Sequence, residues 1–243
     1  ATLGTITSVS DYQTVLKQLV EANKRTDIRY QPYGVPENSI VNGITTVTIE
    51  GISKGLSVFG NHNLQNLYAA YYACRELGIT AANFLASISN FTGAAKRLEL
   101  LASNSNTNIY RDFAHAPSKV KATVQAVKQQ YPDRKLIAVL ELHTFSSLNE
   151  KFMQEYNGAM QNADVAVVFY SSHALEMKRM PPLKKELVVD GFNKQDLLVL
   201  NNKEVLFSWL LEQNYQNCNL LLMSSGNYDG IDMQSFADSV IAQ

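Results

Sequence analysis

From residue 108 onward, the sequence alternates between short apolar runs and segments whose apolar residues recur every three or four positions. The runs are rich in Val, Ile and Leu and span residues 108–115, 135–143, 165–172, 186–192, 196–200 and 218–226. Helix-period segments at 118–131 and 148–163 lie between the first three runs. Strands that alternate with helices form a mostly parallel sheet with helices on both faces. We therefore expect an α/β, Rossmann-like domain in this part of the chain.

The first hundred residues follow a different pattern. A helix-period segment at 14–24 precedes a β-rich stretch at 27–60, whose turn signals, such as Asn42-Gly43 and Glu50-Gly51, predict antiparallel strands. Residues 64–78 predict a helix that ends at a glycine, and the linker is expected between 81 and 108. We place the domains at residues 1–88 and 89–243, with a hinge near 87–93. The apolar, alternating opening segment predicts that the chain was cut from a longer protein.

Composition excludes several classes of protein. A chain of 243 residues with 46% hydrophobic side chains and a formal net charge of −1 can bury a core, so it is not disordered. It also lacks the positive field that attracts nucleic acid. No apolar run approaches the roughly 20 residues of a spanning helix, and the start has no signal-peptide pattern. We expect a soluble, cytoplasmic protein without a membrane partner. Cys74 and Cys218 lack metal-ligand spacing and predict buried, reduced thiols.

Two polar segments stand where a strand-like run meets a helix. In residues 60–66, a helix N-terminus with His and Asn side chains suits a purine edge or an anion, although Asn63 or His62 could simply cap the helix. In residues 111–123, Asp112 and His115 follow a strand, where an open α/β sheet holds a ribose or a phosphate. Alternatively, Asp112 could pair with Arg111 or Arg97.

Two further loops follow predicted strands. The loop after 218–223 contains Ser224, Ser225, Gly226 and Asn227, which either approach a ligand or only form a tight turn. His143, Thr144 and Ser146 lie in a polar turn that either grips a substrate or caps a helix. The sequence contains no GxGxxG, GxxxxGK[ST], GxSxG or HExxH pattern, so it predicts no dinucleotide fingerprint, catalytic triad or metal site.

Four segments, in order and spacing, resemble the Mur ligase family: residues 60–79, 91–99, 110–123 and 222–232. The resemblance covers nearly the whole chain and implies an ATP-dependent amide ligase. In such a ligase a substrate carboxylate takes the γ-phosphoryl group, and an amine then attacks the acyl phosphate. Residues 1–88 would be the β-rich end of a central ATP-binding domain, and residues 89–243 the C-terminal domain. The P-loop and the Mg²⁺ ligands would lie upstream, so the chain alone is expected to be inactive.

The resemblance assigns roles to individual residues. His62, Asn63 and Asn66 match an HNxxN element that borders adenine, and Arg97 matches an arginine that reaches the nucleotide phosphates. Asp112 matches an aspartate that holds the ribose, and His115 the histidine after it. We expect replacement of Asp112 to weaken ATP binding without unfolding the protein.

The substrates implied by the resemblance are UDP-N-acetylmuramate and a peptide or amino acid, in peptidoglycan synthesis or recycling. Residues 222–232 are most like members that add the tripeptide L-alanyl-γ-D-glutamyl-meso-diaminopimelate, with L-alanine as the alternative amine. Residues 141–147 lack the arginine usual in tripeptide-adding members, so His143 with Lys178 or Arg179 would supply positive charge. A Rossmann-like nucleotide-binding module without ligase activity is the alternative from another class.

Overall fold

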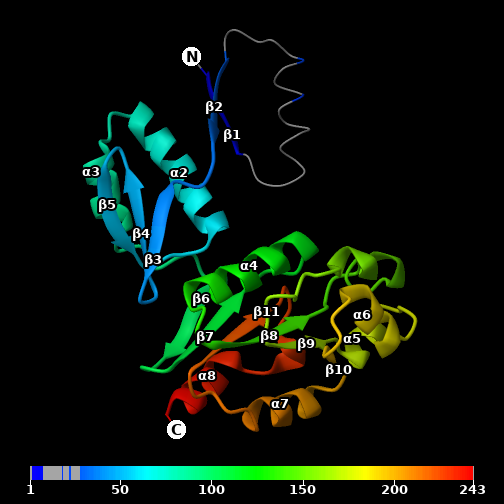
Figure 1. Cartoon of the computed structure of the whole chain (residues 1–243). Coiled ribbons are helices and arrows are strands. Elements are labelled where there is room, and N and C mark those ends of the chain that lie inside the picture. The colour runs from blue at the N-terminus through cyan, green and yellow to red at the C-terminus, as the bar shows by residue number, and fades with distance from the viewer. Residues whose placement is uncertain (1, 8–17, 19–21, 23–27, 243) are drawn as a thin grey trace. The chain divides into compact units, whose positions relative to one another are not determined.

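The computed structural model describes residues 2–7, 18, 22 and 28–242, which include two compact units, residues 1–92 and 93–243. In the first unit, β1 (Thr2–Thr7) pairs in parallel with β2 (Ile28–Tyr33). The strands β3 (Glu37–Val41), β4 (Ile44–Ile49) and β5 (Ile52–Leu56) form an antiparallel sheet, followed by the helices α2 (Asn61–Glu76) and α3 (Ala81–Ile88) (Figure 1). The helix expected at residues 14–24 lies almost entirely outside the described residues.

The sequence predicted the turns of the three-stranded sheet correctly. Asn42-Gly43 and Glu50-Gly51 connect its strands, and all four residues have positive φ, between 51° and 78°. Such two-residue turns match the twist of a hairpin and require residues that tolerate this conformation. The antiparallel prediction was wrong for β2, because β2 pairs in parallel with β1. Val47, Ile49 and Leu56 from this sheet pack with the buried faces of α2 and α3.

The second unit is built on six strands in the order β10-β9-β8-β11-β7-β6. The strands are β6 (Glu99–Ser103), β7 (Thr107–Asp112), β8 (Lys135–Glu141), β9 (Val165–Phe169), β10 (Leu198–Leu200) and β11 (Cys218–Met223). All neighbouring pairs are parallel except β6 with β7. β8 and β11 are buried over almost their whole length, as expected for central parallel strands. The mixed α/β fold with a mostly parallel sheet is therefore confirmed.

Helices cover both faces of this sheet (Figure 1). They are α4 (Pro117–Gln130), α5 (Ser172–Met177), α6 (Lys185–Phe192), α7 (Lys203–Leu211) and α8 (Met233–Ile241), with the short 3₁₀ helices η1 (Glu150–Tyr156) and η2 (Tyr228–Gly230). α4 lies on one face, and α7 and α8 lie on the other. Phe236 of α8 and Leu206 of α7 pack with Leu220 of β11 in the larger core cluster.

Three segments differ from the sequence-based expectations. Residues 186–192, predicted as a strand, belong to helix α6, because Val188, Gly191 and Phe192 share one buried helical face. A Cβ on Gly191 would lie 2.6 Å from the Met153 Cγ atom, so this glycine permits close packing on η1. The helix predicted at 148–163 is a 3₁₀ helix that ends at Tyr156. The linker expected at 81–108 contains α3 and β6.

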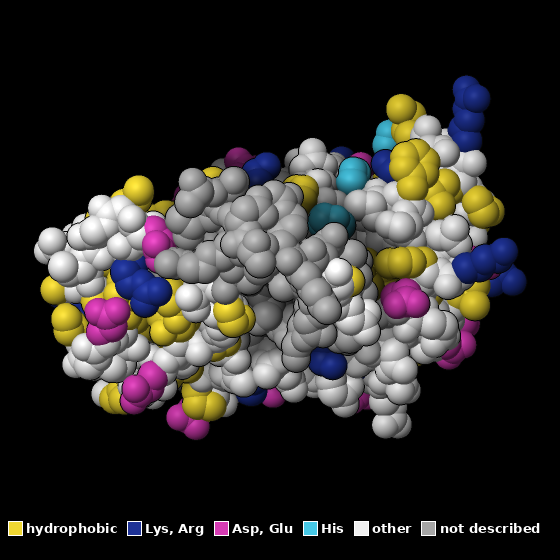
Figure 2. Space-filling view, turned by 90° about the horizontal axis from the view of Figure 1, so that it is seen from above, with side chains coloured by type: hydrophobic (Ala, Val, Ile, Leu, Met, Phe, Trp, Pro, Cys, Tyr) yellow, Lys and Arg dark blue, Asp and Glu magenta, His cyan; other side chains and the backbone are white. Residues whose placement is uncertain are grey.

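Charge and apolar patterning agree with a near-neutral globular chain. Figure 2 shows acidic and basic side chains interspersed with hydrophobic ones on one face. Both cysteines are free, as predicted: Cys218 is buried, and burial raises the pKa of its thiol to about 11, whereas Cys74 is only half-buried. Each helix among the described residues is too short or too polar to cross a membrane.

Candidate functional site

Three of the sequence-predicted segments meet at one edge of the six-stranded sheet. β11 lies between β7 and β8, and the register places Met223 opposite both Asp112 and Leu140. Because the three strands are parallel, their carboxyl ends lie side by side, and the loops that follow them emerge together. Residues 112–116, 141–147 and 224–230 therefore form one loop cluster, which we call the carboxyl-edge loops.

Glu141 connects two of the carboxyl-edge loops. Its carboxyl group is almost fully buried, with 2% of the side chain exposed, and it accepts hydrogen bonds from the Ser224 hydroxyl and from the Tyr228 amide at 2.9 Å. The Tyr228 hydroxyl donates to backbone carbonyls at the ends of β8 and β11. Burying a carboxylate is unfavourable unless hydrogen bonds satisfy it. Glu141 thus fixes the 224–230 loop against the end of β8.

Gly226 lies directly against His143 at the same place. A Cβ at residue 226 would be 2.7 Å from the His143 ring and 2.9 Å from a carboxyl oxygen of Glu141. The His143 Nδ1 atom lies 3.7 Å from the other Glu141 oxygen, and His143 remains partly exposed. The two sequence-predicted amine loops are therefore in contact, and only a residue without a side chain fits between them.

We expect the substitution Gly226→Ala to destabilise this contact. Its Cβ would have to displace a buried carboxylate and an imidazole, and overpacking of this kind costs about 1–3 kcal/mol. Gly34→Ala is the matched control, because a Cβ there would meet nothing within 4 Å. Thermal unfolding should show a lower midpoint for Gly226→Ala than for Gly34→Ala. Equal midpoints for the two variants would contradict the close approach.

The remaining residues of these loops have different environments. Thr144 Oγ1 accepts a hydrogen bond from the Ser147 amide at 3.1 Å, and Thr144 and Ser146 share a hydrogen bond, so this turn is satisfied internally. The Ser225 Oγ atom is buried and has no hydrogen-bond partner within the described residues. Asn227 accepts a hydrogen bond from the Gly230 amide and is exposed.

Asp112, the last residue of β7, accepts hydrogen bonds from two backbone amides. One of its carboxyl oxygens accepts a hydrogen bond from the Leu98 amide and the other from the Ala114 amide, both at 2.6 Å. Burial raises the pKa of the Asp112 carboxyl above its ordinary value, although both amides act in the opposite direction. Of the two partners considered from sequence, Arg111 pairs with Glu99 instead, whereas the charge of the exposed Arg97 acts on Asp112 and lowers the pKa of its carboxyl group.

His115 lies beside Asp112 at the start of α4. Its Nδ1 atom is 3.0 Å from the Phe113 carbonyl oxygen, and its own carbonyl accepts a hydrogen bond from the Tyr156 hydroxyl. Helix α4 begins with Pro117 and has no side-chain cap at its N-terminus. Its first amides therefore face the carboxyl edge of the sheet, in an arrangement that favours an anion.

The other predicted nucleotide residues lie on the first unit. Helix α2 begins after Gly60, which has φ 86°, and no side chain caps it. The capping interpretation of His62 and Asn63 was therefore wrong. Asn63 instead donates from Nδ2 to the Phe59 carbonyl at 2.9 Å, and Asn66 is exposed.

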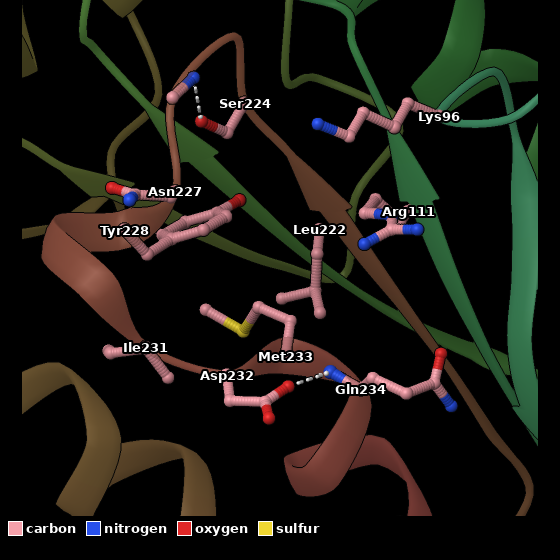
Figure 3. Close-up of a pocket in the computed structure, with 11 residues that line it drawn as sticks. Lys96, Arg111, Leu222, Ser224, Asn227, Tyr228, Ile231, Asp232, Met233 and Gln234 are labelled. Atoms are coloured by element: carbon pink, nitrogen blue, oxygen red, sulfur yellow. Dashed lines mark hydrogen bonds between the residues drawn. The ribbon is translucent and has the colours of Figure 1, made fainter.

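A pocket of about 180 Å³ opens beside the 224–230 loop on the α8 face of the sheet. Figure 3 shows Lys96 and Arg111 entering it from the β6 and β7 side, opposite Ser224, Asn227 and the start of α8. Leu222 and Met233 form its apolar floor. Sequence reasoning missed Lys96 and Arg111 as pocket residues. The pairing of β7 with β11 places Arg111 beside Leu222, and the pairing of β6 with β7 brings the segment that contains Lys96 to the same side.

A known protein family matches the part of the chain that contains these segments. Residues 96–226, more than half of the chain, match the family model described as Mur ligase, glutamate ligase domain. The chain belongs to the Mur ligase family. The matched range contains Asp112, the 141–147 turn and the first part of the 224–230 loop, so the Mur ligase match coincides with the carboxyl edge described above.

Individual relatives agree with this Mur ligase assignment. A UDP-N-acetylmuramate–L-alanine ligase of Desulfitobacterium hafniense is 36% identical over 51% of this chain and 28% of its own length. One of Chlorobium chlorochromatii is 28% identical over 92% of this chain and 51% of its own length. The chain thus spans about half or less of these curated relatives.

Solved structures show the same fold. A UDP-N-acetylmuramate–alanine ligase from Thermotoga maritima has a TM-score of 0.64 at 17% identity, covering 85% of this chain and 44% of that one. A murein peptide ligase from Psychrobacter arcticus has a TM-score of 0.59 at 17% identity, covering 99% and 52%. At this sequence identity, both structures show only that this chain shares their fold.

Proposed function

We propose that this chain is the C-terminal part of an ATP-dependent ligase that joins an amino acid or a peptide to UDP-N-acetylmuramate. The observation that carries the proposal is the carboxyl edge, where three family-matching segments meet around Asp112, Glu141 and Gly226. The two curated relatives described above are named UDP-N-acetylmuramate–L-alanine ligases, which supports this proposal. In this proposal residues 1–88 belong to the central ATP-binding domain and residues 89–243 form the C-terminal domain.

ATP would supply the phosphoryl group that activates the substrate carboxylate, and Mg²⁺ would be bound by residues upstream. The chemistry of Asp112 fits a ribose, because each carboxylate oxygen accepts one backbone amide and retains a lone pair for a hydroxyl group. The uncapped amides at the start of α4 fit an anionic group, and the exposed Arg97 can reach phosphates. His62, Asn63 and Asn66 would border the adenine.

The amine would be bound by the carboxyl-edge loops of the second unit. Candidate residues are His143, Thr144, Ser146, Ser224, Ser225, Gly226 and Asn227. Of these, His143 and Gly226 touch. An anionic tripeptide, as used by murein peptide ligase, fits a loop cluster beside two cationic side chains. L-alanine is the second candidate, and the names of the curated relatives favour it.

The isolated 243-residue chain is expected to release no phosphate from ATP above the buffer background. Phosphoryl transfer depends on positioning and on charge neutralisation by a P-loop and Mg²⁺, and the sequence has no GxxxxGK[ST] motif. A colorimetric phosphate assay with ATP and Mg²⁺ measures this directly. Turnover by the isolated chain at an ordinary enzymatic rate would contradict the division of roles between the domains.

The amine is identified by a substrate panel. The protein encoded by the complete reading frame is incubated with ATP, Mg²⁺ and UDP-N-acetylmuramate, and either L-alanine or the tripeptide is added. Amine-dependent phosphate release together with the coupled product in the mass spectrum supports the ligase and names its amine. Absence of product with both amines would overturn the proposal in favour of a nucleotide-binding module.

A further inference from the structure

The pocket beside β11 has an unusual polar lining. Within the described residues, no carboxylate or carbonyl accepts a hydrogen bond from the Lys96 ammonium group. Arg111 donates Nε and Nη2 to a single oxygen of Glu99, at 3.2 and 2.8 Å, which leaves its Nη1 group available. Asn227 uses its side-chain oxygen within η2, so its Nδ2 group is a further donor. The β6 and β7 side of the wall therefore presents donors, and the Asp232 carboxylate and the Gln234 side chain line the α8 side.

Glu99 offsets only part of this positive charge. Burial would raise the pKa of its carboxyl group, but hydrogen bonds from Arg111 and from the Lys96 amide outweigh burial, and the pKa is lowered. Glu99 is thus an anion that pairs with Arg111, and the charge of Lys96 also lowers its pKa. Asp232, the other acid of the pocket, uses both of its oxygens at the start of α8, on the Gln234 and Ser235 amides and the Ser235 hydroxyl.

The size and the floor of the pocket restrict what it can bind. The volume of about 180 Å³ is smaller than the ~300–1,000 Å³ of typical pockets for drug-sized ligands. Leu222, Ile231 and Met233 present apolar surface below the cationic wall. A few placed polar groups over an apolar floor are typical of small-molecule sites. The dimensions suit one amino-acid residue rather than a whole nucleotide.

We propose that this pocket binds the carboxylate end of the amine substrate through Lys96 and Arg111. The proposal rests on the ligase function proposed above and adds the residues that recognise the anion. The cations expected from sequence were Lys178 or Arg179, which follow α5 after β9, whereas Lys96 and Arg111 lie on the β6 and β7 side of β11. Lys178 instead lies 5.5 Å from the ring centre of Phe145.

The first test measures binding to the chain itself. Backbone amide shifts are followed by NMR while meso-diaminopimelate or L-alanine is added, each compared with its carboxamide analogue. A carboxylate should shift the amides of residues 224–228 and 233–234, whereas the carboxamide should not. Absence of such shifts with both carboxylates at tens of millimolar overturns the pocket.

Variants then separate charge from folding. Lys96→Gln should weaken carboxylate binding about ten- to hundred-fold, as expected for a charge-assisted hydrogen bond. Lys121→Gln, an exposed lysine of α4 on the other face of the sheet, is the matched control and should bind normally. Arg111→Gln combined with Glu99→Gln removes the second cation without leaving an unpaired acid. Unaltered affinity in Lys96→Gln and in this double variant would contradict the proposal.

Glu99→Gln alone gives the opposite prediction. It frees the Arg111 guanidinium from its anionic partner, so carboxylate affinity should rise several-fold, although the chain loses an ion pair. If the Arg111–Glu99 ion pair were only structural, Glu99→Gln would lower the melting temperature and leave the affinity for the carboxylate unaltered. In the complete enzyme, Lys96→Gln should raise KM for the amine and leave KM for ATP unchanged. If the chain binds carboxylates but the complete protein forms no product, the pocket stands and the ligase proposal fails.

Discussion

Replacing Asp112 with alanine is expected to lower the free energy of unfolding by about 2–5 kcal/mol. The change leaves the Leu98 and Ala114 amides without their acceptor in a site that is 8% exposed, and each unsatisfied buried donor costs about 1–3 kcal/mol. Urea unfolding followed by circular dichroism measures the loss. Asp133→Ala, at an exposed turn of the same unit, is the control and should alter stability by less than about 0.5 kcal/mol.

This prediction revises the expectation from sequence, which held that the Asp112 variant would fold normally and lose only ATP affinity. An unaltered free energy of unfolding would show that the hydrogen bonds from the Leu98 and Ala114 amides contribute little to stability. Any effect on ATP affinity must then be measured well below the midpoint of unfolding, where the variant is still folded.

Replacing Glu141 with alanine is expected to release the 224–230 loop. The Tyr228 amide and the Ser224 hydroxyl lose their common acceptor, and a cavity opens beside Gly226. The loss should be about 2–4 kcal/mol in unfolding free energy, since a buried amide and a half-buried hydroxyl lose their acceptor. Calorimetry measures it, and amide exchange of residues 224–230 should become faster than in the wild type.

Glu141→Gln keeps one acceptor oxygen and should lie between the wild type and Glu141→Ala. Glu155→Ala, an exposed acid in η1, is the matched control. If the 224–230 loop exchanges at the same rate in Glu141→Ala as in the wild type, Glu141 does not hold the loop.

The central strands were predictable because β8 and β11 are apolar on both faces, a pattern that fits a strand buried in a parallel sheet. The α6 segment was not, because a short apolar run such as residues 186–192 suits either a strand or a buried helix. Its packing against Met153 decides in favour of the helix.

The candidate site was predictable only in part. The sequence indicated Asp112, His143 and Gly226, because Gly, His and Asp after strands are typical of ligand loops. It did not indicate Glu141 as their support, since that role depends on β11 lying beside β8. The hydrogen bond from the Leu98 amide to Asp112 likewise forms in a segment where Lys96 and Leu98 have positive φ, which their side chains do not signal.

Hydrogen–deuterium exchange on the complete protein tests most directly whether the carboxyl edge of the sheet binds the proposed substrates. The protein is compared with and without ATP, UDP-N-acetylmuramate and the accepted amine. Residues 111–116, 141–147 and 224–230 should exchange more slowly with substrates bound. Residues 104–106, 133–135 and 214–217, at the opposite edge of the same sheet, should be unaffected. Slower exchange at the opposite edge with no change in the carboxyl-edge loops would contradict the account.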